Sequence, residues 1–219
     1  ARVDLFANLP RHFKGTHMSR FIEIFHDYRE DLSMPRFLEM LDHIRANLDA
    51  EAAFGSVTFP YFLEKNAPVS GLTGMMSYEC CYQGSANGGG HHFTVSVSVP
   101  VTTVCPCSKA ISGRGAHNQR GIVRLEVELG PFFWLEDIIA MVEQAASSPV
   151  YSLIKREDEK YLTEHAYDNP KFVEDVVRDV YITIQELNQF PSFSVEAENF
   201  ESIHNHNAFA YAQYKPGKG

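Results

Sequence analysis

Two cysteines and one histidine lie close together in the sequence and could bind a metal ion. Cys105 and Cys107 flank Pro106, which fixes the backbone so that a helix can begin there. A thiol near a helix N-terminus and near Lys109 has its thiolate form favoured. His117, a short way further along, adds an imidazole, and thiolate with imidazole suits zinc or iron. The spacing alone also permits inert thiols and a histidine that caps a turn.

Composition limits the kinds of protein that could contain these residues. The chain has 219 residues, of which 44% are hydrophobic, enough for one large domain or two small ones that share a core. A formal net charge of −9 argues against a protein that wraps nucleic acid. No apolar run is long enough to span a membrane, and no signal-peptide pattern opens the chain. We therefore expect a soluble, cytoplasmic protein that binds neither nucleic acid nor membrane.

The first part of the chain predicts a small module over residues 1–86. Val3, Leu5, Ala7 and Leu9 alternate with polar residues, as in a half-buried strand that Pro10 ends. The expected elements are this strand, a polar loop at 11–19, a helix at 35–49, and strands at 54–64 and 70–83. Because the sequence begins at Ala1 and enters a strand directly, we expect that further residues precede it.

A glycine-rich loop at 87–90 predicts a boundary, and residues 91–219 predict a second module. Alternation or helical spacing gives the expected elements: strands at 92–104 and 121–129, helices at 134–147 and 170–188, and strands at 192–200 and 207–214. An antiparallel sheet backed by helices is the natural packing for this order, so the fold class is α+β. The metal-site candidates lie between the first two strands of this module.

Several stretches carry a family resemblance. The segment PVTTVCPCSK at 100–109, with GAHNQR at 115–120, resembles the signature of GTP cyclohydrolase type IB, the metal-dependent enzyme that opens folate biosynthesis. Residues 14–21, 158–161 with 169–175, and 198–206 also resemble this family, so the resemblance spans nearly the whole chain. One departure is Ala110, where the family pattern has an acidic residue after Lys109.

The resemblance implies a complete metal site. One divalent ion, Zn, Mn or Fe(II), would be held by Cys105, His117 and Glu159, and three protein ligands leave a coordination place for water. Without the resemblance, Glu159 would be interpreted as part of the solvated charge run at 155–160.

The resemblance also assigns the substrate side of the site. Glu174 would anchor guanine, because a carboxylate can accept paired hydrogen bonds from the N1–H and the exocyclic amine. Its alternative is an exposed i,i+4 ion pair with Arg178. His204 would transfer a proton to the purine ring, since an unperturbed imidazole titrates near neutral pH. Cys107 and Glu201 are further catalytic candidates. The candidates for holding the triphosphate are Lys14, His17, Arg20, Lys109 and Arg114.

The same resemblance implies a tunnelling fold (T-fold), with two tandem modules per chain and sheets that join into an oligomeric barrel. We then expect a homotetramer, a dimer of dimers, with active sites at the interfaces and GTP as substrate. The product would be 7,8-dihydroneopterin triphosphate, released with formate. Two alternatives remain: a nitrile reductase of queuosine synthesis on the same fold, and a non-catalytic module in which Cys105, Cys107 and His117 hold a structural zinc in a closed four-ligand shell.

Overall fold

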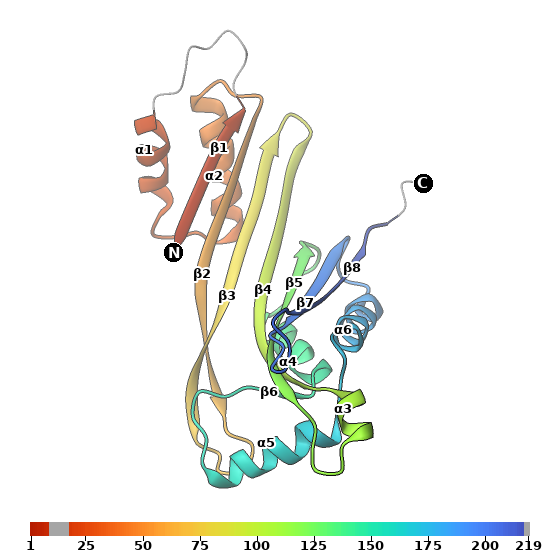
Figure 1. Cartoon of the computed structure of the whole chain (residues 1–219). Coiled ribbons are helices and arrows are strands. Elements are labelled where there is room, and N and C mark those ends of the chain that lie inside the picture. The colour runs from red at the N-terminus through yellow and green to blue at the C-terminus, as the bar shows by residue number, and fades with distance from the viewer. Residues whose placement is uncertain (9–17, 217–219) are drawn as a thin grey trace. The chain divides into compact units, whose positions relative to one another are not determined.

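The computed structural model describes residues 1–8 and 18–216, and these form two compact units. The first unit comprises residues 1–59 and 81–95, and the second comprises 60–80 and the remainder from 96 onward. The chain passes between the units within three long strands, β2 (Ala52–Asn66), β3 (Thr73–Asn87) and β4 (Gly90–Val104) (Figure 1). Lys14 and His17, two of the triphosphate candidates, lie outside the described residues.

The first unit pairs strands with two helices. β1 (Arg2–Asn8) runs antiparallel to β2, and the strand order is β1-β2-β3-β4. Helix α1 (Met18–Tyr28) packs against α2 (Met34–Asn47). Helix α2 has Pro35 in its first turn and buries Phe37, Met40, Leu41 and Ile44 at steps of three and four residues, the spacing that places side chains on one helix face. The ring of Phe37 meets Phe93 of β4 edge to face.

The second unit continues the sheet from β4. Its further strands are β5 (Asn118–Glu128), the short β6 (Ser148–Pro149), β7 (Phe193–Asn199) and β8 (Ala208–Tyr214). The strand order is β2-β3-β4-β5-β7-β8, and β6 pairs with β4. Both β5–β7 and β7–β8 are antiparallel, with Val123 opposite Ala197 in the first ladder. Val123, Leu125 and Val127 alternate into the core, as the sequence pattern predicted.

Four helices belong to this second unit: α3 (Pro106–Ile111), α4 (Leu135–Ala145), α5 (Arg156–Asp168) and α6 (Val173–Leu187). Helix α6 packs on β7, β8 and α4, and Val176, Val177, Val180 and Ile184 form its buried face. The β6–α5 connection runs to the turn between β2 and β3, and α5 runs back from there toward α3 (Figure 1). In the part of the chain that the structure describes, no helix is both long and apolar enough to cross a membrane.

The expected strands and the expected helices at 35–49, 134–147 and 170–188 are confirmed within a few residues. Two helices, α1 and α5, were not predicted; in α5 the many polar residues mask the pattern of an apolar face. The loop at 87–90 forms the turn between β3 and β4. The division into two tandem modules at that loop stays a prediction.

Candidate active site

The turn that opens α3 brings Cys105 and His117 together. Cys105 is the N-cap of α3, and its Sγ accepts a hydrogen bond from the backbone N–H of Ser108 at 3.4 Å. The backbone N–H of Cys105 donates to the carbonyl of His117 at 3.1 Å, and the N–H of His117 donates to Ser108 Oγ at 3.2 Å. These three bonds fix a thiol and an imidazole on one small stretch of backbone, as the strand–helix–strand order suggested.

Two residues that have no predicted role, Gln119 and Thr103, orient the imidazole of His117. Nδ1 of His117 lies 3.0 Å from Gln119 Oε1, and Gln119 Nε2 donates to Thr103 Oγ1 at 2.9 Å. Gln119 and Thr103 are both buried. The sequence could have indicated the His117–Gln119 contact, because residues two apart in an extended chain point to the same side.

Glu201 lies beside the same imidazole. Its Oε2 is 3.9 Å from His117 Nδ1, and the two side chains are 13% and 17% exposed. This oxygen is buried and has no hydrogen-bond partner among the described residues. The segment is attached to β5, because the N–H of Phe200 donates to the carbonyl of Arg120. An unsatisfied buried carboxylate oxygen is costly, and such groups commonly mark a ligand or catalytic position.

Two other residues of the cysteine motif have different surroundings. Cys107 is exposed on α3 and does not contribute to the Cys105 cap. The ammonium of Lys109 donates to the carbonyl of Tyr167 and lies 4.3 Å from the centre of the Tyr167 ring. Lys109 therefore connects α3 to the last turn of α5.

Glu159 lies in the first turn of α5, where its carboxylate pairs with Arg156 at 3.0 Å and is largely exposed. It lines a cavity of about 280 Å³ together with Asn118 and Arg120, which lie one and three residues after His117 in the sequence. Within the described residues, no three His, Cys, Asp or Glu side chains are close enough together to hold a metal ion. The structure thus places Glu159 on a cavity beside the Cys105–His117 turn without joining the three donors.

The start of α5 is held by the residue before Glu159. Asp158 is fully buried, and its carboxylate accepts four hydrogen bonds, from the N–H of Val69, the N–H and hydroxyl of Ser70, and the N–H of Lys155, at 2.6–2.9 Å. Burial alone would raise the pKa of Asp158, but these donors lower it well below its usual range. The β2–β3 turn and α5 are consequently fastened to each other.

The remaining predicted residues are distributed over several elements. Glu174 is exposed in the first turn of α6, and the guanidinium of Arg178, its partner in the alternative interpretation, pairs with Asp175 at 2.8 Å. His204 is exposed in the β7–β8 connection, and its ring stacks on His206 at a centroid distance of 5.1 Å. Arg20 belongs to α1, where its guanidinium donates to the carbonyl of Asn47.

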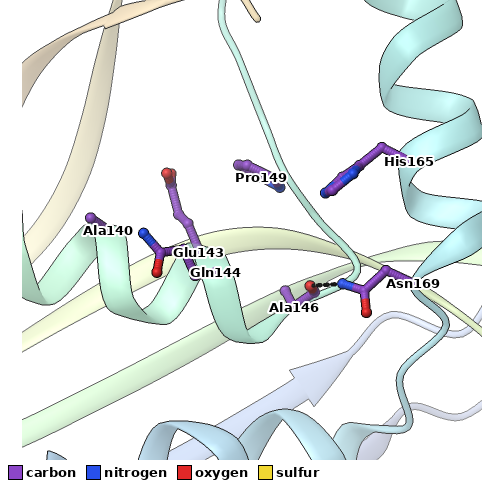
Figure 2. A pocket seen from close by; sticks show the side chains of 7 residues that line it. All are labelled: Ala140, Glu143, Gln144, Ala146, Pro149, His165 and Asn169. Atoms are coloured by element: carbon purple, nitrogen blue, oxygen red, sulfur yellow. Dashed lines mark hydrogen bonds between the residues drawn. The ribbon is translucent and has the colours of Figure 1, made fainter. Parts of the chain in front are cut away.

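A second cavity, of about 380 Å³, lies between α4 and α5 (Figure 2). Glu143 of α4 and His165 of α5 are on opposite sides of it, and Asn169 donates to the carbonyl of Ala146 at 2.9 Å. The carboxylate of Glu143 accepts hydrogen bonds from Lys65 at 2.6 Å and Tyr78 at 3.0 Å. Burial lowers the pKa of Lys65 and raises that of Tyr78. None of the predicted site residues that the structure describes lines this cavity.

Comparison with known proteins gives consistent matches. A family model described as "Type I GTP cyclohydrolase folE2" matches residues 1–210. Proteins named "GTP cyclohydrolase FolE2" from Syntrophus aciditrophicus and Syntrophobacter fumaroxidans are 54% and 52% identical to the chain, covering 97% and 96% of it and 84% and 82% of their own lengths. The relative of the same name from Syntrophotalea carbinolica is 49% identical over 99% of the chain and 81% of its own length.

Solved structures of other proteins match the fold of this chain. Uricase from Arthrobacter globiformis matches with a TM-score of 0.57 at 8% identity, over 99% of this chain and 86% of its own. A uricase from Bacillus fastidious matches with a TM-score of 0.55 at 7% identity, over 91% of this chain and 73% of its own. At such low identity the likeness concerns the fold alone, and it confirms the expected α+β tunnelling fold. Strands β1 and β8 are the two ends of the described strand order, so the closure of a barrel stays a prediction.

Proposed function

The chain belongs to the type I GTP cyclohydrolase FolE2 family, and from this premise we propose that it is an enzyme that hydrolyses GTP to 7,8-dihydroneopterin triphosphate and formate. The observation that carries the proposal is the match to FolE2 relatives at about half identity over nearly the whole chain. The Cys105–His117 turn and the neighbouring Glu201 carboxylate provide a place for the chemistry. The reaction would be the first step of tetrahydrofolate biosynthesis.

The donor set fits a single divalent metal. Cys105 offers a thiol at the N-terminus of α3, and His117 engages Nδ1 with Gln119, which leaves Nε2 for a ligand. Glu159 on the adjoining cavity would complete the set with Zn, Mn or Fe(II). When bound, such an ion supplies a Lewis acid that activates water near neutral pH.

The chain's own residues would then bind and protonate the substrate. Glu174, exposed at the start of α6, would accept two hydrogen bonds from the guanine edge. His204 would donate a proton to the ring nitrogen as the bond to C8 breaks, and its exposed imidazole is accessible for this transfer. Glu201 has a buried carboxylate oxygen available to accept a proton or a hydrogen bond beside His117. Cys107 would assist near the substrate.

We propose that the site is completed by assembly into a homotetramer, a dimer of dimers with interfacial active sites. Support comes from the strand order, which has β1 and β8 at its ends, and from the separation of Glu159 from the other two donors in the single chain. The triphosphate would be held by cations, for which Lys14, His17, Arg20 and Lys109 are candidates. GTP is a cytoplasmic metabolite, so we place the enzyme in the cytoplasm.

The proposed function is tested with metal-stripped protein. The chain is reloaded separately with Zn, Mn and Fe(II) under anaerobic conditions, and formate and pterin formation from GTP are followed together. Both products should appear in equal amounts with at least one metal and not with the stripped protein. Formation of neither product with any of the metals would refute the assignment.

A further inference from the structure

We propose that Gln119 is a positioning residue that keeps the proton of neutral His117 on Nδ1, so that Nε2 is left as the metal-binding nitrogen. The inference deepens the proposed function, because it rests on His117 as a ligand. It starts from the contact of 3.0 Å between His117 Nδ1 and Gln119 Oε1. A neutral imidazole carries one N–H, and the hydrogen bond that this N–H makes decides which nitrogen can bind a metal.

The amide of Gln119 is held at its other end. Its Nε2 donates to Thr103 Oγ1 at 2.9 Å, and Thr103 is completely buried while Gln119 is 7% exposed. With the amide nitrogen directed at Thr103, the amide oxygen faces His117, and an oxygen can only accept. Nδ1 must then be the donor. The imidazole is thereby connected through Gln119 to β4, which ends one residue after Thr103.

A second, independent observation favours the same tautomer. Oε2 of Glu201 lies 3.9 Å from His117 Nδ1 and has no hydrogen-bond partner among the described residues. A carboxylate oxygen at this distance attracts an N–H and repels a nitrogen lone pair. The opposite orientation of the Gln119 amide would turn its NH₂ group toward Nδ1 and would place the lone pair of His117 against this carboxylate. Glu201 therefore disfavours the flipped amide.

A purely structural role for Gln119 makes a different prediction. A buried amide that bridges β4 and β5 contributes to stability whichever way it points, because each orientation can satisfy Thr103. Its loss would then lower the melting temperature without changing the position of the imidazole proton. The tautomer of His117 in the metal-free protein is consequently the deciding measurement, and it is independent of both metal and GTP.

The test uses the metal-free chain with ¹⁵N-labelled histidine, above about pH 7.5, where an unperturbed imidazole is neutral. The His117→Asn variant assigns the resonances. The native chain should show Nδ1 protonated and Nε2 unprotonated, whereas Gln119→Leu, in which only Glu201 still favours the Nδ1–H tautomer, should weaken this preference. The Kd for Zn should rise roughly 10–100-fold in Gln119→Leu, the range observed for residues that support metal ligands. Gln185→Leu, an exposed change on α6, should alter neither quantity.

Two further variants separate positioning from folding. Gln119→Glu keeps an acceptor facing His117, and the hydroxyl of Thr103 can donate to its other oxygen, so this variant should retain the Nδ1–H tautomer. Thr103→Val removes the partner that orients the amide and should weaken the tautomer preference even if Gln119→Leu does not fold. A native chain with the proton on Nε2, or a tautomer unchanged in both Gln119→Leu and Thr103→Val, would overturn the inference. A retained tautomer without GTP turnover would instead count against the proposed function alone.

Discussion

Asp158 accepts hydrogen bonds from both the backbone N–H and the hydroxyl of Ser70, which fastens the start of α5 to the turn between β2 and β3. Glu159 is the next residue in the chain, so the position of a predicted metal ligand depends on a contact with a distant part of the sequence. This relationship suggests the first experiment.

Asp158→Asn should destabilise the chain. The amide can still accept from Val69 and Ser70, but its NH₂ group would face the N–H of Lys155, and two donors cannot pair. We expect the melting temperature to fall by several degrees in thermal unfolding followed by circular dichroism. Asp168→Asn, an exposed change at the end of α5, is the matched control and should leave the melting temperature within a degree or so. Equal melting temperatures for the two variants would contradict the anchoring role.

The same carboxylate predicts a pH dependence of stability. Hydrogen bonds lower the pKa of folded Asp158 below its unfolded value of about 4, so the unfolded chain binds the extra proton more tightly. The stability that Asp158 contributes is present above about pH 4 and is lost as the pH falls through the lower, folded value. Urea unfolding between roughly pH 5 and pH 2 should show a steeper loss for the native chain than for Asp158→Asn. Parallel curves would show that Asp158 does not drive the acid response.

The two cysteines of the motif should differ in metal binding. Cys105 caps α3 beside His117, whereas Cys107 is exposed on the helix. Cys105→Ser should lower the bound metal, measured by elemental analysis after dialysis, to a small fraction of the native amount, because a hydroxyl is a far poorer ligand than a thiolate. Cys107→Ser should keep the native metal content. Loss of metal from both variants would favour a site that uses both thiols.

Glu174→Gln should separate substrate binding from metal binding. The amide loses a charged acceptor for the guanine edge, and each charge-assisted hydrogen bond contributes about 1.5–3 kcal/mol, so kcat/KM for GTP should fall roughly 10²-fold or more. Metal content should be unchanged, because Glu174 lies in the first turn of α6 and does not belong to the Cys105–His117 turn. Glu186→Gln, exposed further along α6, serves as the control. A variant that lost metal in proportion to activity would assign Glu174 to the ligand set.

The sequence predicted those parts of the site that depend on local order. A strand that ends at Val104, a proline-started helix and a strand that begins after His117 necessarily bring Cys105 and His117 close. It could not predict α5, because the helix has a charged surface and its anchor, Asp158, resembles its exposed neighbours in type. Gln119 was overlooked for a related reason: an uncharged amide carries no chemical signal until its two partners are known.

The Asp158–Ser70 contact also makes the β2–β3 turn different from the β3–β4 turn, although both turns are rich in turn-forming residues. At Gly88, in the β3–β4 turn, an added side chain would meet nothing within 4 Å. A peptide tag inserted there should leave the fold and the enzyme intact, as is usual at exposed loop tips. The same tag inserted between Val69 and Ser70 would separate two neighbouring donors to Asp158. Among relatives, the length of the β3–β4 turn should therefore vary, whereas the length of the β2–β3 turn should not.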